Sequence, residues 1–132
     1  MKALFWNIRG FGARGCKGQL KDLVCAENID FIGLVKTLKP SFSPNELSAV
    51  AGIDRFNWNF VASEGHSGGI LLGTKKDVSD FVAFDHGIFW ASTVVSHQSL
   101  NSLVEIMVVY GPADHSMSYN FLDELHNKID TC

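Results

Sequence analysis

The chain has 132 residues, of which 46% are hydrophobic and 19% are charged. These proportions are typical of one globular domain and exclude a disordered chain. The net charge of −3 at pH 7 excludes a protein that coats nucleic acid through bulk positive charge, although a local basic patch remains open.

The N-terminal third predicts a strand, a helix and a second strand. Apolar residues 3–8 form the first strand, and the glycine-rich residues 9–18 form a loop. Apolar residues then recur at helical spacing over 19–28, and the nearly unbroken apolar run at 30–35 is typical of a buried strand.

A short helix is expected to begin at Ser43, because Ser43, Pro44 and Glu46 form a capping box with proline at the first helical position. It ends near Gly52. Five strands and a last helix follow, at residues 57–63, 68–73, 81–87, 88–96, 103–112 and Met117–Ile129, with Ser116 as the cap of the helix. This order predicts an α/β layered fold in a single domain.

The cysteines Cys16, Cys25 and Cys132 are odd in number and form no CxxC pair, so we expect neither a disulfide framework nor a structural zinc site. No apolar run approaches the ~20 residues that cross a bilayer. The N-terminus MKALFWNIRG lacks the pattern of a signal peptide. We expect an intracellular protein, nuclear or cytoplasmic, with no membrane partner.

Three motifs favour structural over chemical roles. GGILLGTKK lacks the order of a phosphate-binding loop, and its glycines are expected to let backbones approach closely. Ser67 in GHSGG is followed by a strand, whereas a nucleophile elbow is followed by a helix. The five histidines stand at no metal-ligand spacing, so the pairs Asp85-His86 and Asp114-His115 are interpreted as turn residues.

Two polar residues stand at strand ends, where α/β folds place their sites. Asn7 ends the first strand, and Tyr110 ends the last long one. From the residues alone, Asn7 is either a site residue or a turn former. Tyr110 is either a site residue or a buried structural tyrosine.

An ordered set of segments resembles the endonuclease/exonuclease/phosphatase family, and most closely the endonuclease domain of plant LINE-type retrotransposons. The segments are WNIRGFG, a DFIGL strand followed by Thr37 and Lys39, SGGILLG, and VYGPA with the following FLDEL. The resemblance implies a four-layer α/β/β/α sandwich. The later motifs of the family are absent, so we expect residues 1–132 to form a truncated half of it, a partial domain with a mixed sheet and helices on one face.

The resemblance also implies site residues. Such enzymes hold Mg²⁺ with an asparagine, matched by Asn7, and with a glutamate in a stretch of the form I-G-L-Q-E-T. Here that stretch is Ile32 to Thr37, and Lys36 stands at the glutamate position. Tyr110 matches a tyrosine that touches the scissile phosphate.

The leading hypothesis is therefore a catalytically inactive fragment without a cofactor, which acts as a protein-interaction module. The alternatives are an Mg²⁺-dependent endonuclease or phosphodiesterase completed by a partner chain, and a non-cleaving nucleic-acid binder that uses Arg9, Arg14, Lys17 and Lys21. Half of the sandwich is expected to leave the inner face of one sheet uncovered. Such a face predicts a homodimer or a hetero-complex.

Overall fold

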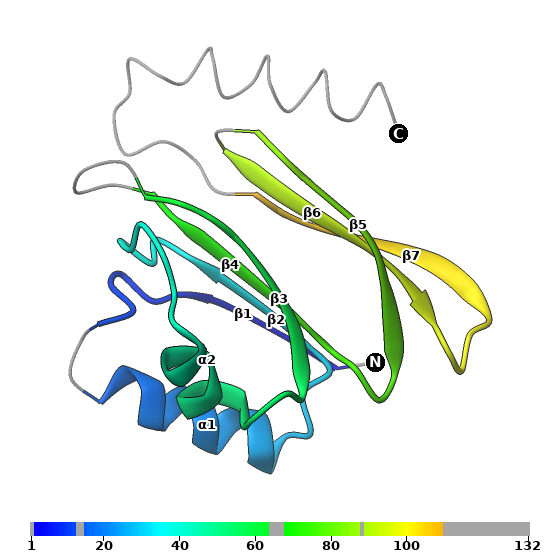
Figure 1. Cartoon of the computed structure of the whole chain (residues 1–132), viewed down its shortest axis with the longest axis horizontal. Helices are drawn as coiled ribbons and strands as arrows, with labels where there is room; N and C mark the ends of the chain where they lie inside the picture. The colour runs from blue at the N-terminus through cyan, green and yellow to red at the C-terminus, as the bar shows by residue number, and fades with distance from the viewer. Residues whose placement is uncertain (1, 13–14, 64–67, 88, 110–132) are drawn as a thin grey trace.

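The computed structural model describes residues 2–12, 15–63, 68–87 and 89–109. They form three layers (Figure 1). Helices α1 (Cys16–Ala26) and α2 (Pro44–Ala51) cover one face of a four-stranded sheet, and a three-stranded sheet lies on the other face. The predicted α/β class, with helices on one face of a mixed sheet, is confirmed.

The four-stranded sheet contains β1 (Ala3–Asn7), β2 (Phe31–Val35), β3 (Phe56–Val61) and β4 (Ile70–Lys75) in the order β1-β2-β4-β3. Strands β1 and β2 are parallel, with α1 as the crossover between them, while β4 runs antiparallel to both β2 and β3. Strand β2 is apolar throughout because both of its faces are covered.

The three-stranded sheet contains β5 (Ser79–His86), β6 (Trp90–His97) and β7 (Ser102–Val109). The strands are consecutive antiparallel neighbours, as the hairpin pattern predicted, and a register shift between Phe81 and Ala83 interrupts the β5–β6 pairing. One edge strand of this sheet is β5 and the other is β7.

The expectation of an uncovered inner sheet face is wrong. Phe31, Ile70 and Leu72 from the four-stranded sheet form one apolar cluster with Ala91 and Val108 from the three-stranded sheet. The turn at residues 76–78, between β4 and β5, takes the chain into a second layer instead of extending the first. The two sheets therefore cover each other within one chain.

Helix α1 starts at Cys16, three residues before the predicted start, and so includes Gly18 from the expected loop. Its N-cap is Gly15, whose φ of 82° is unfavourable for other residues. Cys16, Leu20 and Val24 are buried at intervals of four residues, which places one stripe of the helix against the sheet.

Helix α2 begins as predicted. The hydroxyl of Ser43 accepts a hydrogen bond from the Glu46 N–H at 3.2 Å, and the Glu46 carboxylate accepts one from the Ser43 N–H at 3.2 Å. Lys39 forms an ion pair of 2.8 Å with Glu46. The hydrogen bond from Lys39, followed by the backbone hydrogen bond from Ser43, lowers the pKa of the Glu46 carboxyl.

Cys16 and Cys25 are free thiols, and burial raises the pKa of Cys16 despite the charge of Lys17. No helix within the described ranges is long and apolar enough to cross a membrane. The predicted helix at Met117–Ile129 and Cys132 lie outside the described residues.

Candidate functional site

The carboxyl ends of β1 and β2 bring two predicted site residues together. Asn7 is the register partner of Val35, and Lys36 follows Val35 directly. The loop after β1 stays beside the segment after β2, because the Gly10 N–H donates to the Lys36 carbonyl oxygen at 2.8 Å. Because β1 and β2 are parallel, the metal-site positions implied by the resemblance lie at the same edge of the sheet.

The segments that follow β1 and β2 contain three non-glycine residues whose backbone lies in the left-handed region of φ and ψ. The φ angles are 51° for Arg9, 55° for Lys36 and 58° for Leu38. Each such residue costs roughly 1–2 kcal/mol, and residues of this kind concentrate at functional sites. Sequence reasoning missed this feature, because neither arginine nor lysine nor leucine is a residue that signals a positive φ.

Thr37 anchors the segment after β2 against the start of β4. Its N–H donates to the Gly69 carbonyl oxygen at 3.2 Å, and the Leu38 N–H donates to that of Gly68 at 3.1 Å. The Thr37 side chain is fully buried, and within the described part of the chain its hydroxyl has no hydrogen-bond partner. The predicted role of the SGGILLG glycines, close approach of two backbones, is confirmed here.

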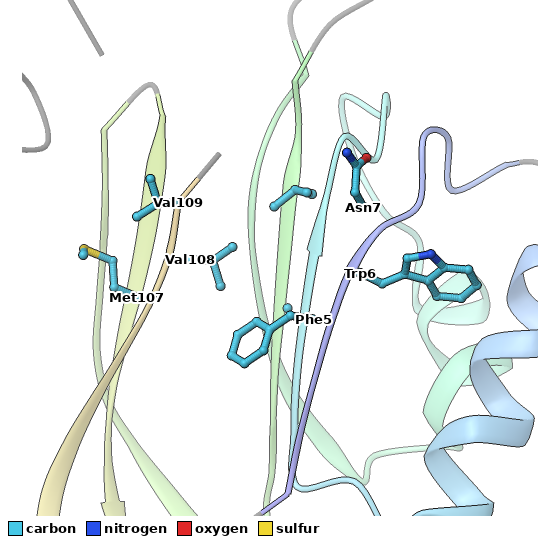
Figure 2. A pocket seen from close by; sticks show the side chains of 8 residues that line it. Phe5, Trp6, Asn7, Met107, Val108 and Val109 are labelled. Atoms are coloured by element: carbon cyan, nitrogen blue, oxygen red, sulfur yellow. The ribbon is translucent and has the colours of Figure 1, made fainter. Parts of the chain in front are cut away.

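A cavity of about 390 Å³ opens between the two sheets beside this edge, along β1, β2 and β7. Its lining consists of Phe5, Trp6, Asn7, Gly33, Val35, Met107, Val108 and Val109. In Figure 2, Phe5 and Val108 point toward each other between the sheets, and Asn7 lies farther along β1, near its end. Trp6 points to the opposite side, toward the helices.

The sequence explains the two faces of β1. Alternation along a strand places Phe5 and Asn7 on the cavity side and Trp6 on the helix side. Figure 2 shows the same alternation, and Trp6 packs against the cluster that contains the helix residues. Asn7 is therefore the polar side chain at the mouth of an otherwise apolar cavity.

The charge at this edge is positive. Residues 7–12 and 35–40 contain Arg9, Lys36 and Lys39 and no acidic residue. Lys39 is paired with Glu46, whereas Arg9 and Lys36 have no ion-pair partner among the described residues. The described ranges also contain no group of three or more His, Cys, Asp and Glu side chains that could hold a metal ion. The arrangement suits an anion better than a cation.

The two histidines within the described ranges are the last residues of strands, so the interpretation of Asp85-His86 as turn residues is wrong. His97 ends β6, and its Nδ1 accepts a hydrogen bond from the Leu100 N–H at 3.2 Å. His86 ends β5, and its N–H donates to the Asp85 carboxylate at 2.8 Å. His66, His115 and His126 lie outside the described residues, as do Ser67, Tyr110, Asp114 and Ser116.

Of the other basic residues that we predicted to bind nucleic acid, the structure describes Lys17 and Lys21. The ammonium of Lys17 lies 5.8 Å from the centroid of the Phe11 ring, which keeps it near the loop after β1. Lys21 is exposed one turn farther along α1. Arg14 lies outside the described residues.

Solved structures with this arrangement of sheets and helices include three from vertebrates. A humanized TDP2 from D. rerio superposes with a TM-score of 0.66 at 12% identity, covering 97% of this chain and 58% of that chain. The human Nocturnin catalytic domain superposes with a TM-score of 0.64 at 12% identity, and the match covers 98% of this chain and 58% of that chain. The catalytic domain of Xenopus laevis APE2 superposes with a TM-score of 0.60 at 18% identity, and the match covers 90% of this chain and 48% of that chain.

The chain has about half of the endonuclease/exonuclease/phosphatase fold. At 12–18% identity the likeness shows this fold and does not extend to activity. Neither a family model nor a curated protein matches the sequence. The chain spans between 40% and 58% of the length of seven such structures.

Proposed function

We propose that this chain is a catalytically inactive member of the fold, derived from the endonuclease domain of a plant LINE-type retrotransposon, and that it acts in protein–protein interaction in the nucleus or cytoplasm. The origin rests on the ordered segments around Asn7, Thr37 and Gly69. The observation that carries the inactivity is the position of Lys36, directly beyond Val35, the register partner of Asn7.

The substitution of a glutamate by Lys36 reverses the electrostatics of a magnesium site. A divalent cation and a single charge at ~4 Å, with an effective dielectric constant of ~20, interact by roughly 8 kcal/mol as an upper-range value. The interaction of the cation with a carboxylate is attractive, and its interaction with an ammonium is repulsive by a similar amount. The flexible stem of Lys36 lets the ammonium turn away, but an ammonium still supplies no oxygen ligand.

The direct test is a metal-dependent nicking assay on plasmid DNA and on DNA that contains an abasic site. We expect no nicking by the wild-type chain above the rate without protein, with Mg²⁺ or Mn²⁺ present. An active AP endonuclease is the positive control, and Lys36→Glu is the matched variant. Nicking by the wild-type chain well above background would overturn the proposal.

The interaction role is supported by exposed apolar side chains at one end of the three-stranded sheet. Leu100 in the β6–β7 turn is 60% exposed and Leu103 at the start of β7 is 67% exposed. Phe81 and Val82 on β5 are also exposed, at the β-bulge. Exposed apolar residues of this kind are typical of interfaces, so we propose that this end of the sheet joins a homodimer or a hetero-complex.

Light scattering on the purified chain tests the homodimer. We expect a dimer that Leu103→Lys dissociates, because a buried lysine in an apolar contact is strongly unfavourable. Ile53→Lys is the matched control, since Ile53 is an exposed apolar residue in the turn between α2 and β3. A monodisperse monomer for the wild-type chain would refute the homodimer.

A second candidate is an Mg²⁺-dependent endonuclease or phosphodiesterase that a partner chain completes. It is favoured by the fold shared with the AP endonuclease structure from Leishmania major, of whose length this chain spans 40%. A third is a nucleic-acid binder that does not cleave and that uses Arg9, Arg14, Lys17 and Lys21. A steep loss of DNA affinity with added salt would support it, and no binding at low salt would exclude it.

A further inference from the structure

We propose that the cavity between the sheets binds a small amphiphilic anion, with its acidic group at Asn7, Arg9 and Lys36 and its flat apolar body between the sheets. This goes beyond the interaction role, which uses a different part of the three-stranded sheet. The proposal rests on the volume and lining of the cavity, on its apolar end, and on the cations in the two segments that follow its lining residues Asn7 and Val35.

The cavity has the size and lining of a small-molecule site. Its volume of about 390 Å³ falls within the range of roughly 300–1,000 Å³ that is usual for ligand pockets. Such pockets are mostly apolar and have a few polar groups that orient the ligand. Here Asn7 is the polar side chain among Phe5, Val35 and Val108, so a ligand is oriented from the mouth (Figure 2).

Gly33 sets the apolar end of the cavity. A Cβ at Gly33 would lie 2.8 Å from Cδ1 of Phe5 and 2.9 Å from Cγ2 of Val108. The two side chains therefore meet over the bare backbone of Gly33. The Phe5 ring is nevertheless 56% exposed, so a flat apolar group that lies on it buries apolar area that is now in contact with water.

The charge at the mouth selects an anion. Lys36 and Arg9 stand on the two segments that extend from the ends of β2 and β1, and no acidic residue occurs in either segment. The hydrogen bond between Gly10 and Lys36 holds the segments together, so the backbones that carry both cations are fixed before a ligand arrives. No described residue is hydrogen-bonded to the Asn7 side chain, which leaves its amide N–H groups available to an acidic oxygen.

A pair of fluorescent probes tests the charge requirement. Anilinonaphthalene sulfonate has an acidic group on a flat apolar body, and its parent, phenylnaphthylamine, has the same body without the charge. We expect one sulfonate molecule to bind per chain, at least about tenfold more tightly than the parent, and to be weakened by added salt. Equal affinity for both probes would overturn the proposal.

Two variants separate charge from volume. Lys36→Met should weaken the sulfonate about fivefold, which corresponds to ~1 kcal/mol of attraction at a water-exposed site, and should leave the parent unchanged. Lys21→Met is the matched control, because Lys21 is an exposed lysine on α1, on the opposite side of the four-stranded sheet. Val35→Phe should weaken both probes, because the larger side chain fills the cavity. Unchanged sulfonate affinity in Lys36→Met or in Val35→Phe would contradict the proposal.

Discussion

The side chain of Thr37 occupies the space into which a Cβ on Gly69 would project. That Cβ would lie 2.3 Å from the Thr37 hydroxyl oxygen and 3.2 Å from the Leu38 nitrogen, so the backbone just before β4 meets the segment after β2 with no room for a side chain. The contact fixes the backbone directly after Lys36. A glycine of the SGGILLG segment is therefore part of the support of the site.

Gly69→Ala should destabilise the protein by about 2–4 kcal/mol, because alanine is strained at the Gly69 φ of 96° and because its Cβ collides with buried Thr37. Urea denaturation measures the change in the free energy of unfolding. Gly12→Ala is the matched control, since no atom lies within 4 Å of the Cβ position at Gly12. A loss of similar size in both variants would contradict this explanation.

Gly18→Ala should have the opposite effect. Gly18 lies inside α1, is exposed, and has no atom within 4 Å of its Cβ position. Alanine restricts the unfolded chain and favours a helix interior by roughly 0.5–1 kcal/mol relative to glycine. The free energy of unfolding should rise by that amount, and a decrease would indicate that α1 does not include Gly18.

Glu46 should make stability depend on pH in the acid range. Its pKa is lower in the folded protein than in the unfolded chain, chiefly because Lys39 donates to it. Its contribution is therefore present above the unfolded pKa and is lost as the pH falls through the folded pKa. The side chains of Lys39 and Glu46 are 26% and 24% exposed, so water screens the pair only in part.

Glu46→Gln isolates this contribution, because glutamine retains the reciprocal hydrogen bond to Ser43 but has no charge. The wild type should be the more stable of the two at about pH 7, and the difference should shrink on acidification to about pH 3. Denaturation curves for both proteins at a series of pH values measure it. A constant difference across the series would show that ionisation of Glu46 plays no part.

The sequence predicts an element well where the interactions that define it join residues that are close along the chain. The α2 start was predictable because the two reciprocal hydrogen bonds of the capping box join Ser43 and Glu46, which are only three residues apart. The α1 start was not, because glycines on both sides of Cys16 conceal it and the burial of Cys16 depends on tertiary contacts. The second layer was missed for a similar reason, since hairpin patterns do not indicate in which sheet a strand lies.

The candidate site was predictable in its residues but not in its geometry. Asn7 and Lys36 were identified from the resemblance, and parallel pairing of β1 and β2 does bring them to one edge. The cavity beside them depends on Val108, which follows Asn7 by 101 residues and Lys36 by 72 residues and carries no motif. The positive φ of Lys36 could not be predicted either, because the backbone there is held by hydrogen bonds from the Gly10 N–H to the Lys36 carbonyl and from the Thr37 N–H to the Gly69 carbonyl.

Added Mg²⁺ should leave the stability of the wild-type protein unchanged and should stabilise Lys36→Glu. A ligand that binds only the folded state raises the free energy of unfolding by RT ln(1 + [L]/Kd), which is about 1.4 kcal/mol when its concentration is roughly ten times the Kd. Lys36→Gln separates the two possible causes of a lost metal site, which are the repulsion by the ammonium and the absence of a carboxylate. It removes the repulsion without supplying an anionic ligand, so a response to Mg²⁺ in Lys36→Glu alone would mean that the missing carboxylate is decisive. A response in both variants would mean that the repulsion by Lys36 is decisive, and a response in the wild type would contradict the proposed loss of the metal site.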